Sequence, residues 1–161
     1  MSLDAGGGKW RNSILVSALI TGIAAVHYLY MRDAYSSMGA DAVTAFRYVD
    51  WILTVPLMCV EFYLILAKAG ATKKLMWILI GLSTAMLVTG YVGEAGLGDA
   101  VVWGSISGVS YFILAYILWF GNPQELANKA GGAVLEAYTA LKWFVLVGWA
   151  IYPIGYMAGT E

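Results

Sequence analysis

The 161-residue chain is 61% hydrophobic and 12% charged, with a formal net charge of -1. This composition excludes an ordinary soluble domain, because a soluble surface of that size needs more charged side chains. It indicates one membrane domain, residues 1–161, and the balanced charge gives no sign of a nucleic-acid partner. The single cysteine, Cys59, excludes an internal disulfide.

Five apolar stretches reach the length of about 20 residues that a helix needs to cross a bilayer. In chain order they cover residues 13–31, 45–67, 74–93, 100–120 and 138–158. The polar connections between them cover residues 36–41, 68–74, 93–99 and 121–136. Asn122 and Pro123 are expected to end the fourth stretch, since proline cannot continue a helical hydrogen-bond ladder. The expected fold is therefore an all-α membrane protein with five transmembrane helices, in which neighbours run antiparallel because their connections are short.

Basic residues are unevenly distributed between the two ends of these helices. Those on the side of the N-terminus are Lys9, Arg11, Lys68, Lys73, Lys74, Lys129 and Lys142. The opposite side has only Arg32 and Arg47. Because lysine and arginine are enriched in cytoplasmic loops, the lysine-rich side and the N-terminus are expected in the cytoplasm.

The second stretch carries the main functional signal. Ionisable side chains within a bilayer are costly, so they are rare and usually functional. Polar and apolar positions at intervals of three and four share one helix face, namely Arg47, Asp50, Thr54, Met58 and Glu61. Asp50 and Glu61 are separated by three turns, or about 16 Å along the axis. Two carboxylates spaced across a membrane predict a proton path, with Asp50 nearer the outside and Glu61 nearer the cytoplasm.

Simpler interpretations stay open for each polar group. Arg47 and Asp50 predict a salt bridge or a shared water cluster, and the simpler alternative is a structural ion pair at a helix end. A protonated Glu61 could donate a proton inward, whereas an acid that extends to the interface would have no such role. His27, at the level expected for Asp50, could pair with that acid, although a lone histidine is more often a packed or interfacial residue.

An aromatic face of the fifth stretch and a small-residue face of the fourth could enclose a flat ligand. The aromatic face comprises Trp149, Tyr152, Pro153 and Tyr156, and the small-residue face comprises Gly104, Ser107, Gly108 and Tyr111. Ordinary helix packing is the simpler explanation of both faces, because small residues let helices approach and aromatic residues fill space.

Longer motifs in the same helices resemble the proteorhodopsin and xanthorhodopsin group of microbial rhodopsins. The motifs that resemble its third helix are residues 46–51 (FRYVDW), 53–57 (LTVPL) and 60–64 (VEFYL). Others resemble the end of its second helix, its sixth helix and a proteorhodopsin turn, namely residues 27–32 (HYLYMR), 148–153 (GWAIYP) and 93–97 (GEAGL). By this resemblance the five predicted helices match helices two to six of a seven-helix bundle.

The resemblance implies a light-driven outward proton pump that uses all-trans retinal, a transporter rather than an enzyme, with no metal site. By residue match, Asp50 resembles the counterion and primary proton acceptor, and Glu61 resembles the proton donor. His27 matches the partner of the acceptor, and Arg47 matches the gate on the exit side. The matches to the retinal pocket are Tyr48, Trp51, Thr54, Met58, Ser107, Tyr111, Trp149, Tyr152 and Pro153.

Further expectations follow from the same resemblance. The nonpolar side chain of Met58 resembles that of green-absorbing members. Gly104 resembles the glycine beside a carotenoid antenna, although a glycine on a packed helix needs no such role. The resemblance also implies the inner membrane of a bacterium, contact with the lipid bilayer, and a homo-oligomer of the intact protein.

The lysine that binds retinal in the family's seventh helix has no match here. The lysines of this chain are Lys9, Lys68, Lys73, Lys74, Lys129 and Lys142, and all are expected in termini, connections or helix ends. The chain is therefore expected to be a fragment of a longer pump that is inactive alone, and the alternative to a fragment is a truncated paralogue. One alternative is a sensory photoreceptor that signals through a membrane partner, although a sensor has no need of Glu61. Another is a five-helix scaffold or proton-conducting bundle without retinal.

Overall fold

The computed structural model describes residue 8, residues 10–39 and residues 41–151, and this part of the chain consists of helices and short turns. The α-helices are α1 (Arg11–Met38), α2 (Asp41–Leu66), α3 (Lys73–Glu94), α4 (Ala100–Phe120), α5 (Asn122–Ala130) and α6 (Gly132–Trp143). A 3-10 turn, η1 (Ala67–Ala69), follows α2, and a π-helical turn, η2 (Phe144–Gly148), continues α6.

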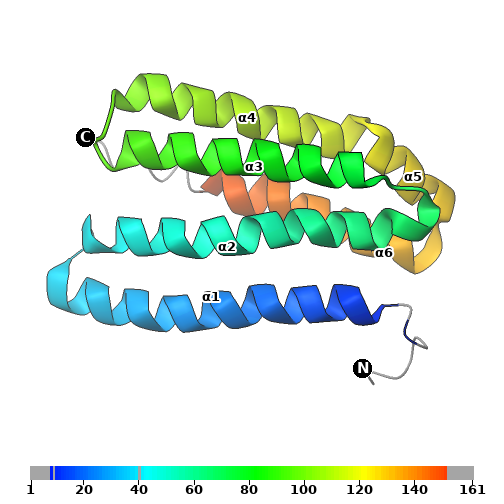
Figure 1. Cartoon of the computed structure of the whole chain (residues 1–161), viewed down its shortest axis with the longest axis horizontal. Helices are drawn as coiled ribbons and strands as arrows, with labels where there is room; N and C mark the ends of the chain where they lie inside the picture. Colours follow the sequence, from blue (N-terminus) through cyan, green and yellow to red (C-terminus); the bar gives the residue numbers. More distant parts are fainter. Residues whose placement is uncertain (1–7, 9, 40, 152–161) are drawn as a thin grey trace.

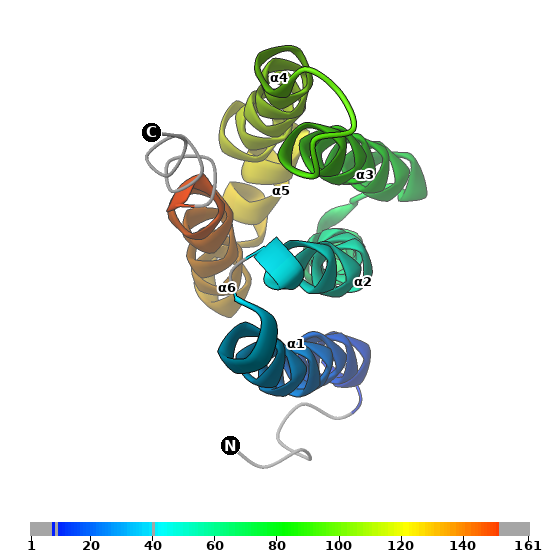
Figure 2. The same cartoon turned by 90° about the vertical axis from the view of Figure 1, so that its left-hand side faces the viewer.

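The helix α2 lies at the centre of the bundle. Figure 1 shows α1 to α4 side by side. The end view in Figure 2 shows α2 in the middle, with α1 below it, α3 above it and α6 to its left. Contacts from α2 reach α1, α3, α5 and α6. Half of the apolar window of this span is buried within the molecule, against at most 22% for the other four spans. The helix α2 is therefore the span that the rest of the described molecule covers most.

Local sequence sets where the helices begin. The hydroxyl of Thr72 accepts a hydrogen bond from the backbone N–H of Leu75 at the start of α3. At the start of α4 the carboxylate of Asp99 accepts from the N–H of Val102 at 2.8 Å. Both are N-caps, which satisfy amide groups that have no partner within the helix. Between α5 and α6 the chain turns at Gly131, whose φ of 62° favours glycine.

Among the described residues, five helical spans are long and apolar enough to cross a membrane, which confirms the all-α class and the predicted number. They are Arg11–Met38, Val43–Ala69, Lys73–Glu94, Ala100–Ala130 and Gly132–Ile151, so that α5 extends the fourth span and η2 the fifth. The predicted polar connection at residues 121–136 is helical, because the polar helix α5 and the start of α6 occupy nearly all of it. The helix α4 ends at Phe120, close to the predicted stop, but Pro123 lies in the first turn of a new helix. Proline is well suited to that position. It lacks a backbone N–H, and in the first turn an N–H would have no acceptor within the helix.

Lys142 requires a second correction. The expected position was a connection or a helix end, but the residue lies inside the last span and is only 8% exposed. Its ammonium group donates a hydrogen bond to the side-chain carbonyl of Gln124 and lies 4.1 Å from the centre of the Trp119 ring. Long helical side chains point toward the N-terminus of their own helix, so Lys142 can reach back to α5.

Candidate functional site

The candidate site is built on the buried face of α2. Asp50 is 2% exposed and Glu61 is 8% exposed, and Thr54 and Met58 between them are also buried. Arg47, one turn before Asp50, is partly buried. The hydroxyl of Thr54 donates to the backbone carbonyl of Asp50 at 2.9 Å. The helical repeat thus brings two ionisable carboxyls to one shielded surface about 16 Å apart.

Asp50 pairs with a histidine from the neighbouring helix α1. The Nδ1 atom of His27 lies 3.2 Å from Oδ1 of Asp50. The imidazole ring is more exposed than the carboxyl, at 24% against 4% of the side chain. A proton on Nδ1 would be donated to the carboxylate, and imidazole is a side chain that can both accept and release a proton. The pair therefore links a buried acid to a second ionisable group that the rest of the described chain covers less.

Glu61 pairs with Ser17, a residue that the sequence interpretation missed. The hydroxyl of Ser17 donates to Oε1 of Glu61. A signal for this contact was available, because α1 and α2 are antiparallel and His27 lies opposite Asp50. Ser17 lies ten positions before His27 on α1, and Glu61 lies eleven positions after Asp50 on α2. The antiparallel register therefore puts Ser17 opposite Glu61.

Arg47 binds Glu94 at the end of α3 instead of Asp50. Its Nη2 atom donates to Oε1 of Glu94 and, at 3.2 Å, to the hydroxyl of Thr44. The predicted salt bridge between Arg47 and Asp50 is therefore wrong, since His27 takes the carboxyl and Arg47 turns toward the helix ends. Periodicity within α2 could not reveal Glu94, because it lies 47 positions further along the chain.

A cavity of about 340 Å³ lies beside this ion pair. Its lining residues are Thr44, Ala45, Tyr91, Glu94 and Ala95. A water molecule takes about 30 Å³ of liquid volume, so the cavity has room for several. The Nε atom of Arg47 is buried and has no hydrogen-bond partner among the described residues. Water in this region would connect the arginine with the end of the bundle.

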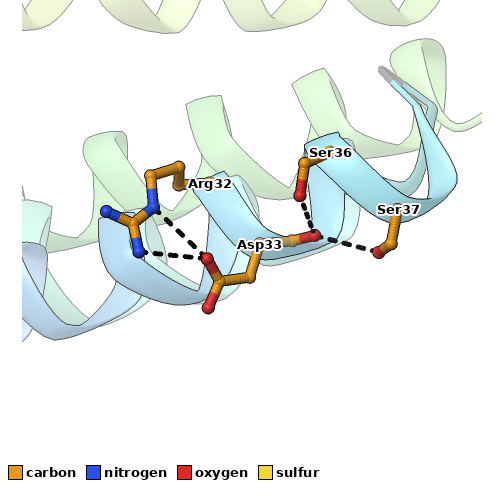
Figure 3. A network of polar contacts seen from close by, with 4 residues as sticks. All are labelled: Arg32, Asp33, Ser36 and Ser37. Atoms are coloured by element: carbon orange, nitrogen blue, oxygen red, sulfur yellow. Dashed lines mark hydrogen bonds and ion pairs between the residues drawn. The ribbon is translucent and has the colours of Figure 1, made fainter.

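The other arginine at this end of the bundle takes no part in the site. Figure 3 shows Arg32 beside Asp33 on the last turns of α1, with Nε and Nη2 each 3.2 Å from the carboxylate. The hydroxyls of Ser36 and Ser37 donate to the backbone carbonyl of Asp33 at 2.9 Å. The side chains of Arg32 and Asp33 are 74% and 71% exposed, so their pairing is a surface feature.

Aromatic and sulfur-containing side chains adjoin the acidic face of α2. The rings of Tyr48 and Trp51 make an edge contact with centroids 5.0 Å apart, and Tyr48 also contacts Tyr91 at 5.2 Å. Met58 belongs to the hydrophobic core, and Trp149 packs against that core from the end of the last span. The structure thus brings Met58 and Trp149, two predicted cofactor-pocket positions, to the same core.

The hydroxyls of the two predicted pocket residues on α4 bind backbone carbonyls. Ser107 donates to the carbonyl of Met86 on α3 at 2.8 Å, and Tyr111 donates to that of Leu146 in η2 at 2.7 Å. Gly104 is exposed, with open space where a side chain would begin. Tyr152 and Pro153, the remaining predicted pocket positions, lie outside the described residues.

Comparisons with known proteins give one consistent result. Residues 3–161 match the family model of bacteriorhodopsin-like protein. The green-light absorbing proteorhodopsin of Gamma-proteobacterium EBAC31A08 is 44% identical over 158 residues, which cover 97% of this chain and 63% of that protein. The blue-light absorbing proteorhodopsin of Gamma-proteobacterium Hot 75m4 is 45% identical over 157 residues, with 97% and 62% covered. The chain therefore spans about three-fifths of the length of these curated relatives.

Solved structures agree with the sequence comparisons. The crystal structure of blue light-absorbing proteorhodopsin from Med12 matches with a TM-score of 0.78 and 43% identity, over 95% of this chain and 68% of that chain. The crystal structure of Exiguobacterium sibiricum rhodopsin matches with a TM-score of 0.81 and 32% identity, over 93% and 67%.

Proposed function

Because the chain belongs to the family of bacteriorhodopsin-like proteins, we propose that the whole protein is a light-driven outward proton pump that uses retinal. Its five apolar helices make it a multi-pass membrane protein of a transporter and photoreceptor family. The observation that carries the proposal is the pair of buried carboxyls on α2. Asp50 and Glu61 lie about three turns apart, and each is hydrogen-bonded to a residue of α1.

In this proposal the two acids have different tasks. Asp50 accepts the proton released on illumination, and His27 relays it toward the outer end of the bundle. The pairing of Arg47 with Glu94, beside a cavity with room for water, supports an exit route at that end. Glu61 supplies the next proton from the other side, and its burial on the same helix face and its hydrogen bond from Ser17 support this role.

The residues around Asp50 fit a long apolar cofactor with one cationic end. Trp51, Met58 and Trp149 supply apolar surface, and a buried carboxylate at Asp50 would balance a positive charge. All-trans retinal would supply the light-sensitive double bond when bound, and the protonated nitrogen of the whole protein that holds it would supply the positive charge and the proton that is transferred. The thioether of Met58 leaves this side of the pocket nonpolar, which supports green absorption.

Orientation follows from charge. Lys68, Lys73 and Lys129 lie at one end of the helices, and we assign this end to the cytoplasm of a bacterial inner membrane. Asp50 then lies nearer the outside than Glu61, which gives outward transport. The open space at Gly104 is compatible with a carotenoid packed there, and a homo-oligomer of the whole protein belongs to the same proposal.

The proposal is tested by light-induced acidification of the medium around cells supplied with retinal. The protein assayed is the full-length one, or a chimera in which green-light absorbing proteorhodopsin supplies the length that this chain does not cover. Asp50→Asn should abolish acidification, because an amide cannot accept the proton. Asp33→Asn, an exposed acid at the same end, is the matched control and should leave acidification intact. Unchanged pumping by Asp50→Asn would refute the acceptor role.

A sensory photoreceptor is the alternative, and Glu61 discriminates between the two functions. A pump needs rapid reprotonation from a buried acid, whereas a sensor does not. Glu61→Gln should therefore slow the photocycle sharply in a pump and have little effect in a sensor. The hydrogen bond from Ser17 to Glu61 supports the pump, since it holds the acid in a fixed position.

A further inference from the structure

A second cavity, of about 530 Å³, lies at the lysine-rich end of the bundle. Four segments form its walls, namely the start of α1, the end of α2 with η1, the end of α5 and the start of α6. Lys68 of η1 and Lys129 of α5 line it together with Asn12 and Ser13 of α1. Groups far apart in the sequence therefore converge on one hollow.

The charge in this cavity is unbalanced. Neither Lys68 nor Lys129 makes an ion pair or hydrogen bond within the described residues. The residues that line the cavity include no acidic side chain. The nearby acid Glu61 is already bonded to Ser17. Two unpaired ammonium groups beside neutral hydrogen-bond donors are a suitable environment for an anion.

Polar and apolar walls together define the class of ligand. Leu64, Ile65 and Val134 supply apolar surface, while Asn12 and Ser13 supply polar groups. We propose that the cavity binds a phosphate-bearing anion, with the two lysines as its cationic contacts. Lysine binds phosphate as a point charge, and basic pockets between helices at the cytoplasmic face bind anionic lipid headgroups. The phosphate could come from an anionic phospholipid or from free phosphate in solution.

The site lies next to the donor acid. Ser13 precedes Ser17 by one helical turn on α1, and Ile65 follows Glu61 by one turn on α2. The bound anion would therefore lie one turn beyond the hydrogen-bonded pair. Its binding requires neither light nor retinal, so the proposal is independent of the pumping function.

The test measures binding to the purified 161-residue chain in neutral detergent. Native mass spectrometry counts bound phosphatidylglycerol and, for comparison, phosphatidylcholine, whose net charge is zero. Calorimetry with inorganic phosphate is the second arm. Lys68→Gln with Lys129→Gln is the test variant. The matched control is Lys73→Gln with Lys74→Gln, which removes the same charge from the same end without touching the cavity.

The unmodified chain should bind one phosphatidylglycerol or one phosphate saturably. The test variant should bind about thirtyfold more weakly, given the usual contribution of a lysine at an anionic surface, and the control should change less than about threefold. Lys68→Arg with Lys129→Arg should retain binding, which separates lost charge from lost folding. Binding of phosphatidylglycerol alone identifies a lipid headgroup, whereas binding of both probes identifies the phosphate group itself. Absence of binding, equal affinity for phosphatidylcholine, or an equal loss in both double variants would overturn the proposal.

Discussion

The two buried carboxyls of α2 have partners of different chemistry. Asp50 contacts the imidazole of His27, and Glu61 contacts the hydroxyl of Ser17. Imidazole gains and loses a proton near neutral pH, whereas a serine hydroxyl only donates or accepts a hydrogen bond. Asp50 is therefore coupled to a second proton carrier, and Glu61 is held by a positioning residue. This difference fits the proposed release of a proton at Asp50 and the proposed supply of a proton at Glu61.

Ser17→Ala should slow light-driven pumping by the full-length protein or the chimera at saturating light. The physical reason is that Glu61 loses the hydrogen bond that fixes its carboxyl. Ser17→Thr keeps the hydroxyl and should pump at the normal rate.

Thr21→Ala is the control for Ser17→Ala, because Thr21 lies one turn further along α1 and bonds only backbone carbonyls of its own helix. A Ser17→Ala protein with unchanged pumping at saturating light would show that the contact has no role in proton supply.

The two arginine pairs at the end of the bundle opposite Lys68 and Lys129 should differ in strength. Arg47 and Glu94 are both partly buried, so a double-mutant cycle to alanine should give a coupling of about 1–2 kcal/mol. Arg32 and Asp33 are exposed and should couple by less than about 0.5 kcal/mol. Reversible unfolding of the variants in mixed micelles measures both values. Equal couplings would contradict the shielding described for Arg47.

Periodicity in the sequence predicts contacts along a helix better than contacts between helices. The shared face of Asp50 and Glu61 needed only the 3.6-residue repeat, and the structure has both acids buried on α2. Ser17 could have been found from the antiparallel register once His27 was paired. Glu94 could not, because its contact with Arg47 depends on the path of α3, which no local pattern in α2 encodes.

At the scale of elements, the junction of α4, α5 and α6 is the least regular part of the fold. A break after Phe120 and a first-turn proline separate α4 from α5, so the carbonyls in the last turn of α4 need other donors. The fully buried Tyr138 on α6 donates its hydroxyl to the carbonyl of Leu118 at 2.5 Å. The sequence showed only that proline interrupts the backbone hydrogen bonds of the helix. It did not show that Tyr138 of α6 supplies a donor to the carbonyl of Leu118 at the end of α4.

Tyr138→Phe should reduce the free energy of unfolding by about 1–2 kcal/mol. The ring still fills its place in the core, but the Leu118 carbonyl loses its donor in a region that excludes water. Tyr116→Phe on the exposed face of α4 removes a hydroxyl of the same kind and should change stability by less than about 0.5 kcal/mol. Unfolding in mixed micelles compares the two, and equal losses would show that the Tyr138 hydroxyl does not act as a cap.

At the scale of the whole molecule, hydropathy summed over about 20 residues was enough to predict five spans, since burial of apolar residues in lipid does not depend on tertiary detail. The same average could not place Lys142, because one charged residue changes it little. Only the structure shows that Lys142 is inside a span, where Gln124 and the Trp119 ring compensate its charge.

This placement leads to a prediction about retinal. Lys142 is the one lysine of the described residues buried within a span, and its ammonium group is directed to α5 instead of Asp50. The 161-residue chain mixed with all-trans retinal should therefore form no covalent adduct. Borohydride reduction followed by mass spectrometry should find an unchanged chain mass, whereas the proteorhodopsin chimera should gain a retinyl group, which is the mass of retinal less one water plus two hydrogens. A mass gain in the chain that disappears in Lys142→Gln would contradict this and identify Lys142 as a second attachment point.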